Sequence, residues 1–554
     1  MNAVGSRMFG RGGRMRLLHV MMVLLVAILA ACSGTSQPVD NKDAVGKEGE
    51  KGQQEGQPKP GGVYTILSPA DPDMLDPHKQ SSIYTHNIVG LVYSKLLTYK
   101  TGPDVDYSDY VLTGDLAEDW EVSEDGKVYT FHLRKDAKWQ NVPPVNGRPV
   151  VAEDVIATME RIRSLPGHQA YMLEKVEKME APDDHTVVFT LKEPFAPFLN
   201  YMANHYMWIL PKEGVEGKFD LATKAIGSGP FILEKWEDNV EAILKRNPDY
   251  YEKGKPYLDE VRIMVVPDQG ARIAAFRAGQ AESIGIISPR EVENLRKSNP
   301  DINVSKVLFP TYVIVYMNMT KPPFDDLRVR KAISMAIDRK GLTKQIFGDG
   351  EVSSPVNPSL ADWGLPLEER EALQPYDPEK AKALLKEAGY PNGFSTKIMV
   401  TNAYGEQVIQ AAQWIAEDLK KVGINAEIEV VEYATYFSKR WPGLQYDIGV
   451  GFQSFYQEPD EWLRGQLHSK SPRNWFGVKI PELDKMLDEQ RLIMDEEQRK
   501  KKVHEIQRYV LENVINPIPL ITHYVETPHQ PWVRDHHPHA SYGNTHLKDV
   551  WLDK

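Results

Sequence analysis

Residues 377–430 decide the fold, and they read DPEKAKALLKEAGYPNGFSTKIMVTNAYGEQVIQAAQWIAEDLKKVGINAEIEV. Asp377 is typical of a helix N-cap, Pro378 of the first helical position and Gly389 of a helix end. The stretches 394–400 and 424–430 predict strands. Because an amphipathic helix is expected between these strands, near 405–422, the stretch predicts a strand–helix–strand crossover in a largely parallel sheet.

The chain on either side of this stretch has the same mixed character. Alternating apolar residues predict strands at 127–133 and 186–191. A helix is expected around 328–336, capped by Asp325 or Asp326. Gly227 and Gly229 are expected to allow a close backbone approach before a strand. The predicted fold class is α/β, and ligands of such sheets sit in crevices outside the carboxyl ends of the strands.

The size and charge of the chain limit its organisation and partners. A length of 554 residues is too great for one core, so two or three domains are expected. The net charge is −12, and the first 31 residues contain four arginines and no acid, so the remainder is more acidic still. Because that charge repels phosphate backbones and no basic stripe offsets it, a nucleic-acid partner is not expected.

The first 60 residues predict secretion and anchoring. A basic region from Arg7 to Arg16 precedes an apolar run that is too short to span a bilayer, so a retained membrane helix is the weaker interpretation. Leu29-Ala30-Ala31-Cys32 then resembles the bacterial lipobox, which implies a signal peptide at 1–31 and a lipid on Cys32. Cys32 is the only cysteine, which excludes an intramolecular disulfide. Residues 32–60 are polar and predict a flexible tether with a span of about 30 Å.

Several short blocks in the folded part carry a family resemblance. None is specific alone, but together they run in one order over roughly residues 60–525. The blocks include Gly114-Asp115-Leu116-Ala117-Glu118-Asp119-Trp120, Gly227-Ser228-Gly229-Pro230-Phe231, Arg246-Asn247-Pro248-Asp249-Tyr250-Tyr251, Pro323-Phe324-Asp325-Asp326 and Ala336-Ile337-Asp338-Arg339. The chain in this respect resembles the family-5 extracellular solute-binding proteins of ABC importers, which bind peptides, nickel or oligosaccharides.

The resemblance implies a two-lobed, periplasmic-binding-protein-like α/β fold with a hinge. The first lobe would combine 61–95, 224–308 and 525–554 with an inserted domain at 96–223, and the second lobe would be 309–524. The implied function is capture of peptides by hinge closure for an ABC permease and its ATPase subunits, with oligosaccharides as the alternative ligand. A monomer outside the cytoplasm, held to the cell membrane by lipidated Cys32, is expected.

The resemblance also places the ligand between the lobes, beside the segment after a strand at 446–451. Phe452, Phe455 and Tyr456 lie in that segment. Peptide binders of the family typically have Gly-Trp-x-x-Asp there, and the Asp pairs with the α-amino group of the peptide. Phe452 stands at the Trp position and Phe455 at the Asp position, which argues against ordinary peptide binding because a buried ammonium without a carboxylate is costly. Glu458 or Asp460 is the candidate substitute.

Other aromatic and imidazole side chains are candidates for the ligand wall. They are Tyr84, His86, Trp139, Tyr312 and Trp475. Core packing is the alternative for each aromatic residue, and Trp475 is favoured because its Pro-Arg-Asn context is polar. For His86 a metal or heme ligand competes with a solvent-facing helix position. For His529, His536, His537, His539 and His546 a metal site competes with a solvated loop, which is the favoured interpretation.

An enzyme is the rival class, in the form of a secreted lipoprotein hydrolase. Two carboxylates would suffice for a glycosidase, but a chain with 78 acidic residues always contains some such pair. Gly-x-Ser-x-Gly is absent, His504-Glu505 lacks the second His of a zinc protease, and no Walker A sequence occurs. The sequence therefore predicts a binding protein without a cofactor or a catalytic residue.

Overall fold

The computed structural model describes residues 57–80, 82–165 and 169–554, apart from the side chain of Ala434. The predicted signal peptide, Cys32 and the tether up to residue 56 lie outside the described residues. Residues 57–554 form one compact unit. None of the helices in the described ranges has the length and apolar character that crossing a membrane requires.

The first lobe is built on two antiparallel-rich sheets, with orders β1-β10-β9-β8 and β4-β5-β7-β6. Strand β1 runs parallel to β10, and the other pairs in both sheets are antiparallel. The strands are β1 (Val63–Ser68), β2 (Leu97–Tyr99), β3 (Leu112–Gly114), β4 (Ala117–Val122), β5 (Val128–Leu133), β6 (Val176–Asp183), β7 (Thr186–Leu191), β8 (Phe231–Glu237), β9 (Glu241–Arg246), β10 (Glu260–Val265), β18 (Val533–Arg534) and β19 (Trp551–Leu552).

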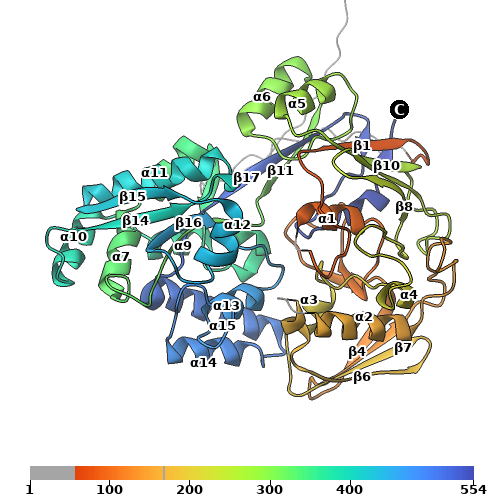
Figure 1. Cartoon of the computed structure of the whole chain (residues 1–554), viewed down its shortest axis with the longest axis horizontal. Helices are drawn as coiled ribbons and strands as arrows, with labels where there is room; N and C mark the ends of the chain where they lie inside the picture. The colour runs from red at the N-terminus through yellow and green to blue at the C-terminus, as the bar shows by residue number, and fades with distance from the viewer. Residues whose placement is uncertain (1–56, 81, 166–168) are drawn as a thin grey trace, which may run out of the picture. The chain divides into compact units, whose positions relative to one another are not determined.

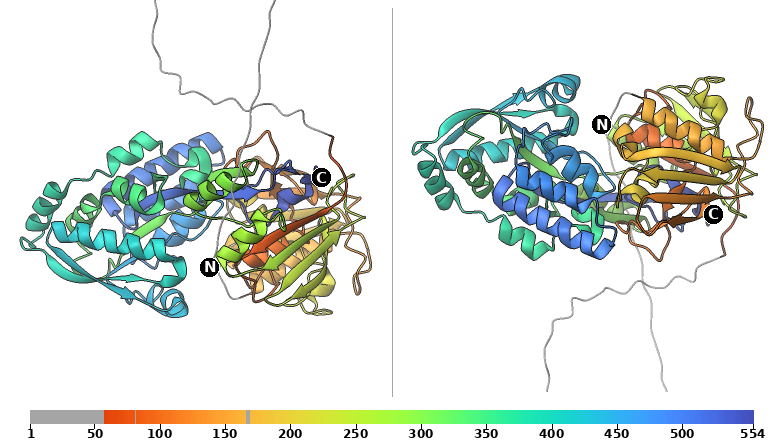
Figure 2. Two further views of the ribbon diagram at one scale, coloured as in Figure 1. Left: turned by 90° about the horizontal axis from the view of Figure 1, so that it is seen from above. Right: turned by 90° about the horizontal axis from the view of Figure 1, so that it is seen from below.

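The helices of the first lobe cover these sheets, and α2 packs against β6 and β7 (Figure 2, right). They are α1 (Ile83–Val89), α2 (Ala152–Ser164), α3 (Phe198–Met202), α4 (Lys212–Val215), α5 (Gln269–Arg277) and α6 (Pro289–Ser298). The strands predicted at 127–133 and 186–191 are confirmed as β5 and β7. The close approach at Gly227 is confirmed too, because a Cβ there would lie 1.9 Å from the Val92 carbonyl oxygen.

Two antiparallel strands, β11 (Asn303–Leu308) and β17 (Ile518–His529), connect the first lobe with the second (Figure 1). The last six residues of β17 pair with β11, and His529 and Glu526 also bridge to Ser283 and Ile287 of the first lobe. The first residues of β17 pair with β12 and β13 of the second lobe. One continuous strand is therefore shared by the sheets of both lobes.

The second lobe contains the crossover that the sequence predicts. Strand β14 (Phe394–Val400) is followed by α11 (Glu406–Lys421) and β15 (Ile424–Val430), and β14 pairs in parallel with both β15 and β16 (Ile448–Phe452). Asp377 caps α10 (Pro378–Glu387), and Asp326 caps α7 (Leu327–Ala336). The predicted caps and strands of this stretch therefore agree closely with the structure.

The sheet of the second lobe is mixed, whereas a largely parallel sheet was expected. Its order is β11-β17-β12-β16-β14-β15, and β12 (Val313–Met317) is antiparallel to both β16 and β17. Strand β12 enters the lobe from the hinge, and β17 returns to the hinge. Because the chain enters and leaves at the same edge, these two neighbours must run in opposite directions. Strand β13 (Gly350–Val352) pairs with β17 beside this path.

Helices cover both faces of this mixed sheet (Figure 1). Apolar residues of α7, α10 and α11 form one buried cluster with β14 and β16. Tyr312, Ile314 and Tyr316 of the β12 segment form a second cluster with helices α13 to α15. The remaining helices of the lobe are α8 (Arg339–Leu342), α9 (Leu367–Leu373), α12 (Tyr433–Thr435), α13 (Pro459–Leu467), α14 (Pro481–Gln490) and α15 (Glu496–Tyr509).

Candidate functional site

The segment from Phe452 to Glu461, which follows β16, is where the second lobe touches the first. The Phe455 ring stacks on Tyr542 of the first lobe, with centroids 4.1 Å apart and an interplanar angle of 14°. The Gln457 Oε1 accepts a hydrogen bond of 3.3 Å from the His205 backbone N–H. The segment lies outside the carboxyl end of β16, the position at which α/β sheets hold ligands.

Local sequence explains how the segment ends. Glu458 is the N-cap of α13, and its carboxylate accepts a hydrogen bond of 2.6 Å from the Asp460 N–H. Pro459 occupies the first helical position, and Asp460 and Glu461 lie in the first turn. Acidic residues are favourable there because the helix dipole is positive at its N-terminus. Capping and dipole together favour three carboxylates at the start of α13, and two of them, Asp460 and Glu461, contact the first lobe.

Glu461 is a buried carboxyl group that both lobes hold. Its Oε1 accepts hydrogen bonds from the Tyr171 hydroxyl (3.2 Å) and the Asn204 Nδ2 (2.9 Å) of the first lobe. Its Oε2 accepts one from the Gln457 N–H at 2.8 Å. Burial, together with a smaller effect of the neighbouring Glu458, raises the pKa of Glu461 to about 7, against the lowering effect of the Gln457 hydrogen bond. The hydrogen bonds of Glu461 with Tyr171 and Asn204 therefore exist only while the lobes touch.

Asp460 and Glu458 are each paired with a buried arginine. Asp460 Oδ2 lies 3.2 Å from the Arg491 Nε and accepts a hydrogen bond of 3.0 Å from the Tyr201 hydroxyl of the first lobe. Glu458 pairs with Arg499, and the two side chains are 1% and 3% exposed. Since buried charges are stable only when paired, both carboxylates are committed to protein partners.

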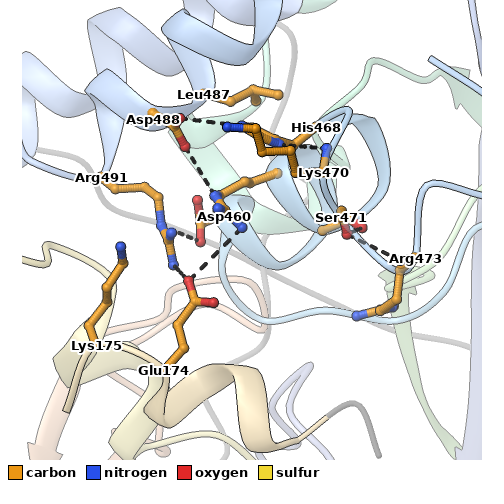
Figure 3. A network of polar contacts seen from close by, with 12 residues as sticks. Glu174, Lys175, Asp460, His468, Lys470, Ser471, Arg473, Leu487, Asp488 and Arg491 are labelled. Carbon is orange, nitrogen blue, oxygen red and sulfur yellow. Dashed lines mark hydrogen bonds and ion pairs between the residues drawn. The ribbon is translucent and has the colours of Figure 1, made fainter. Parts of the chain in front are cut away.

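Arg491 also reaches across to the first lobe, as Figure 3 shows. Its NH2 group lies 2.9 Å from Glu174 Oε1, and its guanidinium lies 4.5 Å from the centroid of the Phe195 ring. The Arg491 carbonyl accepts a hydrogen bond from the Ala196 N–H at 2.8 Å. Arg491 therefore joins Asp460 of its own lobe to three groups of the other lobe. We call Glu174, Asp460 and Arg491 the interlobe triad.

A pocket of 270 Å³ lies beside the interlobe triad. Tyr171 and Glu174 line it from the first lobe, and the second lobe contributes Asp460, Arg464, Gly465, Ser471, Pro472, Arg473 and Arg491. The Arg464 Nε lies 3.2 Å from the Asp488 carboxylate, and the Arg464 guanidinium lies 4.0 Å from Glu174. The pocket is thus charged on both sides and spans the lobe interface.

Phe452, Phe455 and Tyr456 lie in one short segment, but their side chains have different surroundings. Phe455 faces the first lobe. Phe452 is half-buried against Tyr404 and Phe309 at centroid distances of 5.5 and 6.1 Å. Tyr456 is 3% exposed, and its hydroxyl accepts a hydrogen bond of 2.7 Å from the Asn357 N–H. Phe455 is therefore the predicted residue with the clearest contact across the lobes.

Trp475 and Tyr312 both lie in the second lobe. Trp475 is half-buried and makes edge contacts with Trp441 (5.2 Å) and Phe437 (5.8 Å). Tyr312 is fully buried and donates a hydrogen bond of 2.9 Å to the Pro355 carbonyl. The placement of Tyr312 supports core packing, whereas Trp475 is partly exposed.

The first-lobe candidates lie apart from one another. Trp139 is fully buried and donates a hydrogen bond of 3.0 Å to Asp154, so its placement supports core packing rather than a ligand wall. Tyr84 is half-buried on α1. His86 is fully buried, accepts from the Trp208 indole N–H (3.2 Å) and donates to the Gln80 carbonyl (3.0 Å).

The structure corrects the solvent-facing position that the sequence favoured for His86, because the side chain is fully buried. Its ring contacts His205 edge-on at 4.8 Å, and burial lowers its pKa to about 4. His86 is thus a neutral imidazole packed at the centre of the first lobe, because its two ring nitrogens find partners there. In the described ranges no group of three or more His, Cys, Asp or Glu side chains is arranged to hold a metal ion.

Three of the five C-terminal histidines are buried, so the expected solvated loop is wrong for them, while His536 and His537 are partly exposed. His529, His539 and His546 are each less than a tenth exposed. The His536 ring stacks on His529 at 4.6 Å and meets His546 edge-on at 4.9 Å. Burial lowers the pKa of His529 and His539 to about 4. Neutral imidazoles here serve as flat packing surfaces.

A larger crevice of 580 Å³ lies within the first lobe, away from the interlobe segment. Its lining includes Tyr250, Tyr251 and Trp208 together with charged groups. Lys255 lies 2.5 Å from Asp549, and Lys548 pairs with Glu252. Because these charges are paired with one another, the crevice offers less to a ligand than the interface does.

Sequence reasoning missed the first-lobe partners of the interlobe segment. Tyr171, Tyr201 and Asn204 lie more than 250 residues before the carboxylates they bond. Tyr542 lies near the C-terminus. No local motif marks these residues, and only the folded chain brings them to Glu461, Asp460 and Phe455.

Comparison with known proteins agrees with this architecture. The family model for bacterial extracellular solute-binding proteins, family 5, middle part, matches residues 111–474. The dipeptide-binding protein of Escherichia coli is 30% identical over 431 residues, which is 72% of this chain and 78% of that protein. Heme-binding protein A of Haemophilus influenzae is 28% identical over 440 residues, covering 74% and 78%.

A solved structure extends the likeness to the fold. The ABC transporter-associated periplasmic binding protein DppA from Helicobacter pylori, in complex with the peptide STSA, matches with a TM-score of 0.75 and 28% identity. The match covers 90% of this chain and 99% of that chain. The two-lobed α/β fold expected from the sequence is confirmed. The chain belongs to the bacterial extracellular solute-binding proteins of family 5, the substrate-binding components of ABC importers.

Proposed function

We propose that this protein captures peptides between its two lobes and presents them to an ABC permease. The observation that carries the proposal is the interlobe segment 452–461, which contacts the first lobe through Phe455, Asp460 and Glu461. The strands β11 and β17 supply the hinge about which the lobes open and close. A ligand that contacts both lobes shifts the equilibrium toward the closed form. Release is driven by ATP hydrolysis in a separate subunit.

The peptide as ligand is supported by the relatives. Proteins about 30% identical to this chain are named for dipeptides in Escherichia coli and for di- and tripeptides in Pseudomonas aeruginosa. We also propose the lobe boundaries 61–95, 224–308 and 525–554 for the first lobe, 96–223 for its inserted domain and 309–524 for the second lobe. The protein acts as a monomer and not as an enzyme. Tyr84, Trp475 and the other candidate wall residues stay predictions.

Ligand-dependent closure is the test of the proposed function. The full chain, purified in detergent, is incubated with a tripeptide library or with maltotriose, and bound molecules are identified by mass spectrometry after gel filtration. Small-angle scattering then compares the radius of gyration with and without ligand. Retention of peptides with a smaller radius supports the proposal. Retention of maltotriose alone would instead support an oligosaccharide-binding protein, and hydrolysis of either ligand would support an enzyme.

Substitution of Cys32 by Ser is expected to release the protein from the cell. We propose that a lipid on the Cys32 thiol anchors the chain, because two or more acyl chains hold a protein to a bilayer stably. The measurement is the share of protein in the membrane fraction and in the medium or periplasm, before and after the C32S change. The control is Ser33→Ala, which leaves the thiol in place. Equal membrane association of C32S and the parent would disprove the anchor.

Peptide affinity is expected to fall about tenfold between pH 5.5 and pH 8. Burial raises the pKa of Glu461 to about 7 in the closed form, and an exposed carboxyl titrates near 4.3. The closed form therefore binds more protons between these two values, so closure is strongest at acid pH and weakens as the pH rises toward 7. Glu458 and Arg473 are the charged groups whose fields act on Glu461.

Calorimetric titration at both pH values measures the change in affinity. Glu461→Gln keeps an uncharged group of the same shape and should remove most of the pH dependence. An unchanged pH dependence in E461Q would assign the effect to another group.

A further inference from the structure

Two buried glutamines in the interlobe segment have amide groups that no protein atom satisfies. Gln453 is 1% exposed, and neither its Nε2 nor its Oε1 has a hydrogen-bond partner among the described residues. Gln457 is 2% exposed; its Oε1 accepts from His205, but its Nε2 is likewise unpartnered there. Buried polar atoms are almost always paired with a hydrogen-bond partner, and leaving one unpaired is costly. These three atoms therefore point to a partner that the protein alone does not supply.

Tyr110 brings a third polar group to the same interface. It belongs to the first lobe, yet it packs against the core of the second lobe as well as against its own. The Tyr110 hydroxyl is buried and has no hydrogen-bond partner in the part of the chain that the structure describes. The fields of Tyr456 and Glu461, which belong to the interlobe segment, both act on Tyr110. Donors and acceptors without partners thus come from both lobes.

The carboxylates of the same segment are not available to a ligand. Glu458 is paired with Arg499, and Asp460 is paired with Arg491. Both oxygens of Glu461 already accept hydrogen bonds from the protein, and burial favours its neutral form. Neither Glu458 nor Asp460 can therefore substitute for the acid that Phe455 replaces. The segment offers a ligand neutral hydrogen-bonding groups and no free negative charge.

Aromatic rings frame these neutral groups. Phe452 precedes Gln453 and contacts Tyr404, while Phe455, which lies between the two glutamines in the sequence, stacks on Tyr542 of the first lobe. Rings of this kind exclude water, so an ammonium ion placed here would lose its hydration without gaining a counter-charge. A planar amide of a ligand suits these surroundings. A glutamine side chain can donate a hydrogen bond to the carbonyl of the ligand amide and accept one from its N–H.

We infer that Gln453 and Gln457 bind an uncharged amide of the ligand, so that the site selects peptides with a capped amino end over peptides with a free ammonium. The inference rests on the proposed function, because it specifies which peptides the same cleft takes. Gln453 is assigned as a specificity-determining residue. The carbonyl of an acyl cap accepts hydrogen bonds from the glutamine Nε2–H groups, which have no partner among the described residues. The cap also removes the positive charge of the amino end, for which the site has no counter-charge.

The first experiment is a competition between matched ligands. The full chain in detergent is mixed with one tripeptide library in two equimolar forms, N-acetylated and free-amine, and retained peptides are counted by mass spectrometry. We expect at least tenfold enrichment of the acetylated form. Equal retention, or enrichment of the free-amine form, would overturn the inference and leave the proposed function standing. Retention of neither form would overturn the proposed function itself.

The second experiment substitutes Gln453 by Leu. The change removes the unsatisfied amide at similar volume, so the melting temperature without ligand should stay the same or rise. The affinity for the retained acetylated peptides should fall at least tenfold, measured by calorimetry. The matched control is Gln413→Leu at an exposed position of α11, which should leave affinity unchanged. A lower melting temperature together with unchanged affinity would show a structural role for Gln453 and disprove the assignment.

Discussion

Substitution of Arg499 by Met is expected to lower the free energy of unfolding by about 3–5 kcal/mol. Arg499 pairs with Glu458 in a site where both are almost fully buried, and its Nε donates a hydrogen bond of 3.0 Å to Gln490 Oε1. Methionine leaves Glu458 as a buried charge without a counter-charge, which is the costly way to break such a pair. Both residues belong to the second lobe, so the loss should appear in the stability of that lobe.

Chemical denaturation measures this effect. The double substitution Glu458→Gln with Arg499→Met removes both charges and should recover part of the lost stability, because no unpaired ion remains. Lys502, on the same helix, is a partly exposed control that pairs with Glu489, and Lys502→Met should change stability much less. A loss in R499M no larger than in K502M would show that the pair contributes nothing to folding.

Substitution of Arg491 by Met is expected to open the lobes. Arg491 is matched to Arg499, because each pairs with a buried carboxylate of its own lobe, but only Arg491 also contacts Glu174 and the Phe195 ring of the first lobe. The substitution removes these contacts and leaves Asp460 unpaired at the interface. It should therefore disfavour the closed form by about 2–5 kcal/mol. Peptide affinity should fall by at least thirtyfold, and the radius of gyration should rise.

Glu174 separates the interlobe effect from the effect on folding. Glu174→Gln removes only the first-lobe counter-charge of Arg491, so it should weaken closure in the same direction, by less, without destabilising the second lobe. Lys175→Met is the neighbouring control, since Lys175 pairs with Glu193 inside the first lobe. Unchanged affinity and scattering in R491M would remove the interlobe triad from the mechanism.

Local chemistry made much of the second lobe predictable. Asp377, Pro378 and Gly389 delimit α10, and the strands at 394–400 and 424–430 occur with the predicted bounds. These features depend on capping and periodicity, which act over a few residues. The antiparallel pairing of β12 with β16 and β17 was not predictable in the same way, because it depends on where the chain enters and leaves the lobe.

The site was less predictable because its partners are distant in sequence. Phe455 could be identified from its position after β16. The commitment of Glu458 and Asp460 to arginines more than 30 residues later could not, since nothing near either acid marks its partner. His86 shows the same limit: nothing in its helix marks the Trp208 indole or the Gln80 carbonyl, which bind its two ring nitrogens.

The shared strand β17 restricts the kind of motion that the proposed hinge allows. Its ladder with β11 joins Asn303 to His529 and Leu308 to Tyr524 without interruption. A slip of one residue along that ladder would turn every side chain of the strand to the opposite face. The lobes can therefore swing but cannot slide past each other, and every cycle of capture and release must bring Phe455 back against the same ring, Tyr542.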